Sequence, residues 1–398
     1  MARRTSTKSK RLSNWLEGLL VSTLVAGTTL VGAQPSAYEQ TNLVSNIPGL
    51  AAITDPMLVN PWGISRGPAT PFWVSNQETN SSTLYRVTGS AGTDVSRVAI
   101  PPNGFVAIPT TGGGPQGPTG EVFNSNTASF QLTPGDPTTA SRFIFADLNG
   151  TISGWAGGPS AAIRATTPGA VYTGLGINAA GTRLYAADTV SGDIHVFDSA
   201  FAKLSAAPGA FVDPSVPASF GAFNVQDLGG TVYVTYAPDG LAAQRGATRG
   251  MGFVSAFDEN GSFLRTVVNG SRLASPWGLA LAPASFGPFG GDLLVGNFSF
   301  VASEINAFDP TTGNLEGTIP VGTGTAYTPG GLWALSFGNG GAGGSPNTLY
   351  FANGINGETD GLLGALAPIP EPSTVALTAA GLLLLCGWRY RSRRRNDE

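Results

Sequence analysis

Cysteine, histidine and lysine are nearly absent from this chain of 398 residues. The only cysteine, Cys386, lies near the C-terminus, so the rest of the chain cannot form an internal disulfide and must be stabilised by packing. The only histidine, His195, excludes a zinc site with several histidine ligands, and no Cys–His pair is left for nucleophilic catalysis. A Ser-His-Asp triad would need His195, but its place in the alternating stretch 193–198 favours a solvated or packing side chain.

Basic residues are scarce between the two ends of the chain. Residues 34–370 hold 11 arginines and lysines against 21 aspartates and glutamates, which gives a net charge of −10. Such an acidic surface repels phosphate backbones, so we do not expect nucleic acid as a partner. Cationic ligands and divalent ions are electrostatically favoured instead.

A recurring unit of short strands takes the place of long helical periodicity. The 56 glycines and 29 prolines, with abundant valine, serine and threonine, favour strands joined by turns. Each unit has a turn rich in proline and glycine, an apolar strand, a second strand that ends in a polar residue, and a third strand. The units occupy residues 72–87, 142–158, 181–201, 231–240 together with 252–268, 292–319 and 348–366. The leading turns are 60–65, 117–124, 172–178, 223–228, 275–281 and 330–338.

The spacing of these units indicates a closed ring. The residues that end the second strands are separated by 71, 41, 48, 61 and 56 positions, and they are Asn76, Asp147, Asp188, Tyr236, Asn297 and Asn353. If the two ends of residues 34–367 pair, the closing interval consists of the 14 residues after Asn353 and the 43 residues from 34 to Asn76. Its length is then similar to that of the other intervals, as a closed ring requires. We therefore predict an all-β fold in which residues 34–367 form a six-bladed β-propeller.

Other β architectures fit these intervals less well. A β-sandwich would lack the matched turns, and the coils of a β-helix would be shorter than these units. The long first interval contains residues 100–120, which we interpret as a surface excursion, and a seventh blade stays open if that segment contributes strands.

The repeated motifs are similar to those of NHL-type repeats. Pro-Trp-Gly occurs at Trp62 and again at Trp277, the second strand ends in Asp or Asn in five of the six units, and Phe-Asp precedes a glycine turn. The resemblance covers most of residues 50–366 and implies an NHL-like propeller. The chain also resembles an uncharacterised family of exported bacterial proteins with propeller-like bodies, which implies fold and export.

The polar ends of the second strands are candidate metal ligands. If they project inward together, five of them form a ring of oxygen ligands for Ca²⁺ or Mg²⁺, namely Asn76, Asp147, Asp188, Asn297 and Asn353. Lactonase-type propellers, which these repeats distantly resemble, hold such an ion with one Glu together with Asn and Asp residues. Glu121 is the nearest candidate here for that Glu. The alternative is that these side chains accept hydrogen bonds from the turns that follow, which we favour.

Trp62 and Trp277 are candidates for an aromatic platform. Exposed indoles in matched turns would let sugar rings stack, whereas buried indoles would wedge neighbouring blades together. Trp333 lies close to the matched place in the sixth unit.

The N-terminus predicts a secretory signal peptide over residues 1–33. Five basic residues within the first eleven precede the apolar stretch 19–31, which is too short to span a bilayer comfortably. The small residues at 32–33 suit signal peptidase, and residue 37 is an alternative cleavage point.

The C-terminus predicts a sorting signal over residues 368–398. A short apolar run, Val375–Trp388, follows a Pro-Glu-Pro motif, and at 14 residues it would span about 21 Å as a helix against about 30 Å of hydrocarbon. The motif residues are Pro370, Glu371, Pro372, Ser373 and Thr374, and the terminal arginines, which we expect to stay cytoplasmic, are Arg389, Arg391, Arg393, Arg394 and Arg395.

This tail resembles the PEP-CTERM sorting signal. The resemblance implies recognition by an exosortase, cleavage near the Pro-Glu-Pro motif, and release or transfer to the outside of a Gram-negative envelope. The tail would then be a transient membrane anchor, and a plain permanent anchor is the alternative.

Two functions from different classes follow from these features. The first is an exported cell-surface or extracellular-matrix binding or scaffold protein, acting with exopolysaccharide or a surface protein. The second is a metal-dependent hydrolase or lactonase that uses the Asn/Asp rim. The scarcity of catalytic residue types favours the first.

Overall fold

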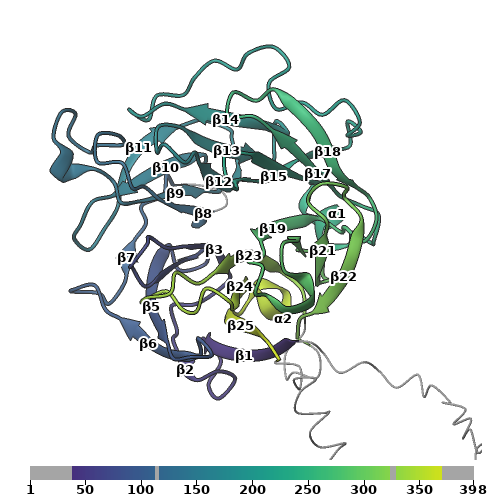
Figure 1. The fold of residues 1–398 in the computed structure, drawn as a ribbon. Helices are drawn as coiled ribbons and strands as arrows, with labels where there is room; N and C mark the ends of the chain where they lie inside the picture. Colours follow the sequence, from purple (N-terminus) through teal and green to yellow (C-terminus); the bar gives the residue numbers. More distant parts are fainter. Residues whose placement is uncertain (1–37, 113–115, 323–328, 370–398) are drawn as a thin grey trace, which may run out of the picture. The chain divides into compact units, whose positions relative to one another are not determined.

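The computed structural model describes residues 38–112, 116–322 and 329–369, all within one compact unit. The strands of this part of the chain form six sheets. Figure 1 shows the sheets following one another around a ring, with the innermost strand of each facing the centre. The predicted all-β fold and its six blades are therefore confirmed.

Blades one and two follow the predicted order, in which each strand pairs with the next. Blade one consists of β3 (Pro61–Ser65), β4 (Phe72–Asn76), β5 (Ser81–Thr88) and β6 (Asp94–Val98). Among the described residues of the excursion, Val106–Ala107 form β7, which pairs with β5, and residues 118–120 begin the first strand of blade two, so they add no further blade. Blade two consists of β8 (Pro118–Phe123), β9 (Phe143–Asp147), β10 (Thr151–Trp155) and β11 (Ala162–Thr166).

Blade three has one strand fewer than its neighbours. It consists of β12 (Tyr172–Ile177), β13 (Leu184–Asp188) and β14 (Asp193–Phe197).

Blade four consists of β15 (Phe220–Asp227), β16 (Val232–Pro238), β17 (Phe253–Phe257) and β18 (Phe263–Asn269). Blade five consists of β19 (Pro276–Leu281), β20 (Leu293–Asn297), β21 (Glu304–Phe308) and β22 (Leu315–Pro320).

Blade six closes the ring with strands from both ends of the described chain. It consists of β23 (Leu332–Phe337), β24 (Leu349–Asn353), β25 (Leu362–Pro368), β1 (Tyr38–Ser45) and β2 (Ile53–Thr54). β1 pairs antiparallel with β25 from Tyr38 opposite Pro368 to Ser45 opposite Leu362. This pairing is the closure that the spacing predicts.

The second strands are buried along their whole length, as in Phe72–Asn76 and Val232–Pro238. Both faces of each blade pack against neighbouring blades, so apolar residues occupy both faces of these strands. The outer strands are largely exposed, as in Asp94–Val98 and Ala162–Thr166. The core is therefore a set of clusters between consecutive blades.

The segments that the sequence suggested as leading turns are in fact the innermost strands. β3, β8, β12, β15, β19 and β23 each occupy the inner position of a sheet. In every blade the ladder between the first and second strands is interrupted by a register shift. Such a bulge re-aims side chains, and the proline and glycine that suggested turns mark it.

Glycines let neighbouring inner strands approach closely. A Cβ on Gly120 would lie 2.3 Å from the Leu175 amide nitrogen, and one on Gly278 would lie 2.3 Å from the Trp333 carbonyl oxygen. Main chain packs on main chain at these places, so no side chain fits.

In the part of the chain that the structure describes, helical structure is confined to short connections. These are α1 (Leu241–Arg245), α2 (Ile355–Glu358) and the 3₁₀ turns Pro137–Thr139 and Gly287–Phe289. Among the described residues, none of the helices has the length and apolarity needed to cross a membrane. The predicted signal peptide, the Pro-Glu-Pro motif, the apolar C-terminal run and the terminal arginines lie outside the described residues.

Candidate functional site

Five aromatic side chains fill the centre of the ring, and we call them the aromatic plug. The Trp62 and Trp333 rings stack with centroids 3.4 Å apart, and Trp277 meets Trp333 edge-on at 5.6 Å. Phe298 stacks on Trp333 at 4.2 Å, and Phe223 lies 5.7 Å from Phe298. These side chains come from blades one, four, five and six, so one cluster joins four of the six blades.

The bulges of the inner strands place four of the plug residues. In blade one, Pro61 on the inner strand pairs with Asn76 on the second strand, and Trp62 comes directly after Pro61. Phe223, Trp277 and Trp333 occupy the same place in their blades. In blades two and three the matched residues are threonines, and both donate to the carbonyl oxygen of the next inner strand, Thr119 to Tyr172 and Thr173 to Phe223, each at 2.7 Å.

The predicted aromatic pair is brought together but is buried. Trp62 is 6% exposed and Trp277 is 4% exposed, so neither indole forms an open surface platform. Trp277 Nε1 donates to the Thr173 carbonyl oxygen at 2.9 Å, and Trp333 Nε1 donates to Asn60 Oδ1 at 3.1 Å. Trp62 Nε1 is buried without an acceptor. The wedge interpretation of these tryptophans thus matches their packing.

A cavity of about 820 Å³ lies against one side of the plug, and we call it the aromatic pocket. Trp62, Phe223 and Trp333 contribute to its lining, together with loops beyond the starts of the inner strands. Its apolar wall residues are Val59, Leu148, Val171, Val190 and Leu241, and its polar residues include Asn60, Gln77, Glu78, Gln244, Arg245 and Glu358.

An ion pair lies beside this pocket. Arg245 Nε donates to Glu358 Oε2 at 2.9 Å, and a second guanidinium nitrogen contacts the same oxygen. The Glu358 side chain is 7% exposed, and its burial raises the pKa of this carboxyl, although Arg245 opposes the shift. Asn60 Nδ2 lies 3.4 Å from Glu358 Oε1.

Left-handed backbone conformations gather at the same place. Asn60 has φ 46°, Asn356 has φ 56° and Glu358 has φ 71°. Non-glycine residues adopt this region only where the surroundings hold them there, and such residues concentrate at functional sites. The conformation of the loop around α2 therefore fixes the carboxylate of Glu358 in the pocket.

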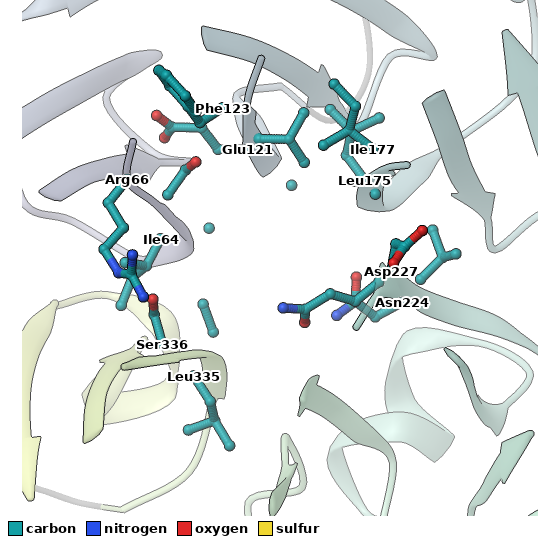
Figure 2. A pocket seen from close by; sticks show the side chains of 18 of the residues that line it. Ile64, Arg66, Glu121, Phe123, Leu175, Ile177, Asn224, Asp227, Leu335 and Ser336 are labelled. Carbon is teal, nitrogen blue, oxygen red and sulfur yellow. The ribbon is translucent and has the colours of Figure 1, made fainter. Parts of the chain in front are cut away.

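A second, smaller cavity of about 300 Å³ lies at the other ends of the inner strands, and we call it the polar pocket. All six inner strands contribute to its lining, and Trp277 belongs to it. Figure 2 shows Arg66 and Ser336 on one side of this cavity and Asn224 and Asp227 on the opposite side. The plug thus separates two mouths of the central channel.

Glu121, the acidic candidate from the sequence, lies in the wall of the polar pocket. Its carboxylate accepts from Ser75 Oγ at 2.9 Å and from Ser82 Oγ at 3.2 Å, both on blade one. Burial raises the pKa of Glu121 to about 8, and the two hydroxyl donors oppose that rise. Its Oε1 has no hydrogen-bond partner in the described chain, and the raised pKa favours the protonated acid at neutral pH.

The two aspartates of the predicted rim cap turns. Asp147 Oδ1 accepts from the amides of Asn149 at 2.8 Å and Thr151 at 3.0 Å. Asp188 Oδ1 accepts from the amides of Val171 at 2.9 Å and Val190 at 3.1 Å. Both carboxylates are buried, and each satisfies the turn at the end of its own strand.

The three asparagines of the rim are buried too, but their contacts differ. Asn297 accepts from the Ala274 amide at 3.0 Å, and Asn76 donates to Ser81 and Thr83. Asn353 has no partner for either side-chain atom. Among the described residues, no group of three or more His, Cys, Asp or Glu side chains is placed to hold a metal ion.

His195 is part of a small polar cluster on blade three. Its Nδ1 lies 3.0 Å from the Tyr172 hydroxyl, and its Nε2 lies 3.3 Å from Lys203 Nζ and 3.8 Å from Asp188 Oδ2. Burial and the Lys203 ammonium lower the pKa of His195. The ring meets Tyr172 edge-on, which agrees with packing, the second of the two alternatives for this side chain.

The sequence interpretation missed the polar side of the aromatic pocket. Arg245 and Glu358 are 113 residues apart, and the repeated motifs single out neither of them. Phe223 had a partial signal, because it opens one of the matched segments, whereas Phe298 had none.

Comparison with known proteins finds relatives in Acanthamoeba polyphaga mimivirus, although no protein-family model matches the chain. "Uncharacterized protein R648" is 30% identical over 343 residues, which are 81% of this chain and 78% of the relative. "Uncharacterized protein L690" is 29% identical over 347 residues, which are 83% of this chain and 86% of the relative.

Among solved structures, Kuenenia stuttgartiensis hydrazine synthase is similar with a TM-score of 0.44 and 14% identity, over 77% of this chain and 80% of that chain. The identity and coverage of the first mimivirus relative are what define the family. The chain belongs to the same family as uncharacterized protein R648 of Acanthamoeba polyphaga mimivirus.

Proposed function

We propose that the protein is an exported binding protein whose ligand site is the aromatic pocket. The observation that carries this proposal is a cavity of about 820 Å³ lined by the plug and aliphatic residues, with a few polar groups at fixed places. Cavities of this size and lining are typical of sites for small ligands. The ligand is therefore a small and mainly apolar molecule.

Two exposed apolar side chains of the pocket support this proposal. Val190 is 65% exposed and Leu241 is 52% exposed, although both are large apolar residues that line the cavity. A ligand in the cavity would cover both side chains and remove their apolar surface from water.

A binding role agrees better with the side chains than a hydrolytic role does. The oxygens of Asp147 and Asp188 already accept hydrogen bonds from turn amides, and His195 is held by Tyr172. A hydrolase that uses the rim would have to free those oxygens for a metal ion.

Displacement of a fluorescent apolar probe tests the site. We expect N-phenyl-1-naphthylamine to bind the purified protein and to brighten, since its surroundings become apolar. Leu241→Ser should weaken this binding, whereas Leu264→Ser should leave it unchanged, because Leu264 is similarly exposed at 55% but lies on β18. Equal binding by both variants would contradict the proposal.

Export and sorting form a second part of the proposal. We propose that the chain leaves the cytoplasm through its signal peptide, is held by its tail, and is processed by an exosortase before reaching the cell surface. The mass of the mature protein tests this, because it should lack residues 1–33 and 373–398. Exopolysaccharide that binds without displacing the probe would place a glycan partner on another surface.

A further inference from the structure

We propose that the ligand of the aromatic pocket is an organic cation, a substituted ammonium compound with an apolar body. This inference rests on the proposed function, because it names the chemical class that the same pocket takes. It depends on the charges around the pocket and on its aromatic lining.

Carboxylates outnumber cations in the lining of the pocket. Its two carboxylates are Glu78 and Glu358, and its one cationic side chain is Arg245. Because a cavity with low-dielectric walls concentrates the field of its charges, the potential inside favours a cation.

Arg245 does not neutralise the pocket for a ligand. Its guanidinium is bound to Glu358 at 2.9 Å and lies over the Phe300 ring, 5.6 Å from the centroid. Glu78 is exposed at the pocket, and no ion pair of the described chain includes it. Its negative charge is therefore free to meet a ligand.

The aromatic lining fits the same class of ligand. Trp62, which is 6% exposed, is the most accessible aromatic ring of the lining, whereas Trp333 is fully buried between Trp62 and Phe298. A cation within about 6 Å of such a ring is attracted to its face. An anion of the same size would meet the carboxylates without a free cationic partner, so the pocket discriminates by charge as well as by apolarity.

Matched probes separate charge from shape. We use benzyltrimethylammonium, its neutral carbon isostere neopentylbenzene and the anion phenylacetate, each competing with N-phenyl-1-naphthylamine on the purified protein. We expect the cation to displace the dye at the lowest concentration, about fivefold or more below the neutral isostere. Added salt should weaken binding of the cation and leave binding of the isostere unchanged, because screening acts only on charge.

A charge-removing variant locates the effect. Glu78→Gln should lower the affinity for the cation about fivefold and leave the affinity for the isostere unchanged. Glu316→Gln removes the same charge from the exposed strand β22 and should change neither.

The outcomes distinguish this inference from the proposed function. If the isostere binds as tightly as the cation, the cation class is wrong and the binding site stands. The same conclusion follows if none of the three probes displaces the dye while Leu241→Ser still weakens binding of the dye. If the dye does not bind in the pocket at all, the proposed function fails with it.

Discussion

Arg245 on the loop of blade four donates from Nε to Glu358 Oε2 on the loop of blade six, at 2.9 Å. Blade five lies between them in the ring, and the Phe300 amide of its own loop donates to the Arg245 carbonyl oxygen at 2.9 Å. One arginine therefore ties together loops of three consecutive blades beside the aromatic pocket.

Arg245→Ala is expected to lower the free energy of unfolding by about 2 kcal/mol near neutral pH. The change leaves the buried Glu358 carboxylate without its counter-ion, but the arginine side chain is 43% exposed, so the loss is smaller than for a fully buried pair. Chemical denaturation measures it.

The pH dependence of that loss identifies its cause. Burial already raises the pKa of Glu358, and without Arg245 the carboxyl should protonate still more readily. The destabilisation should therefore be larger at pH 8 than at pH 5. Arg86→Ala, on an exposed position of β5, should change little at either pH, and an equal effect of both variants would contradict the assignment.

Gly120→Ala is expected to destabilise the protein by at least about 2 kcal/mol, because overpacking against main chain cannot be relieved by a rotamer change. The new Cβ would lie 2.3 Å from the Leu175 amide nitrogen, where inner strands of blades two and three meet. Gly112→Ala is the control, since a Cβ there meets nothing within 4 Å. Thermal unfolding of the two variants provides the comparison, and similar melting temperatures would refute this account.

The number of blades could be predicted because each blade repeats one local pattern. Second strands such as Phe72–Asn76 are buried throughout and mainly apolar, so this pattern marks the units. The inner strands were misassigned as turns, because proline and glycine usually break strands. Here Pro61 and Gly63 flank a bulge in which tertiary contacts, invisible in the local sequence, override that preference.

The aromatic pocket could be predicted only in part. Trp62 and Trp277 stood out because their motif repeats, but their burial depends on how four blades meet at the centre. Arg245 and Glu358 come from loops that differ between blades, and their contact follows from the closure of the ring. The repeated pattern therefore predicts the six blades, whereas it does not predict the polar side chains that line the aromatic pocket.

Removal of divalent ions tests the predicted rim. Because Asp147 and Asp188 accept amide hydrogen bonds from their own turns, we expect a chelator to leave the melting temperature unchanged. Added Ca²⁺ should likewise have no effect. A rise of several degrees with Ca²⁺ would show a bound ion and restore the metal-dependent alternative, since a ligand that binds only the folded state stabilises it.

Glu121 predicts a loss of stability as the pH rises. Its pKa in the folded protein is about 8, above the ordinary value of 4.5, so at intermediate pH the unfolded chain ionises while the folded chain keeps its proton. The folded state then binds more protons, and stability from this group falls between about pH 4.5 and pH 8, by at most about 1.4 kcal/mol per pH unit. Below and above that window the contribution is constant.

Glu121→Gln removes this titration while keeping the shape of the side chain and its acceptor for Ser75 and Ser82. We expect the variant to be more stable than the parent at pH 8 and nearly equal at pH 4.5, with a flatter profile between them. Glu316→Gln, at an exposed position, should keep the slope of the parent. Denaturant unfolding across this range gives both curves, and parallel profiles for Glu121→Gln and the parent would show that the carboxyl is already ionised in the folded protein.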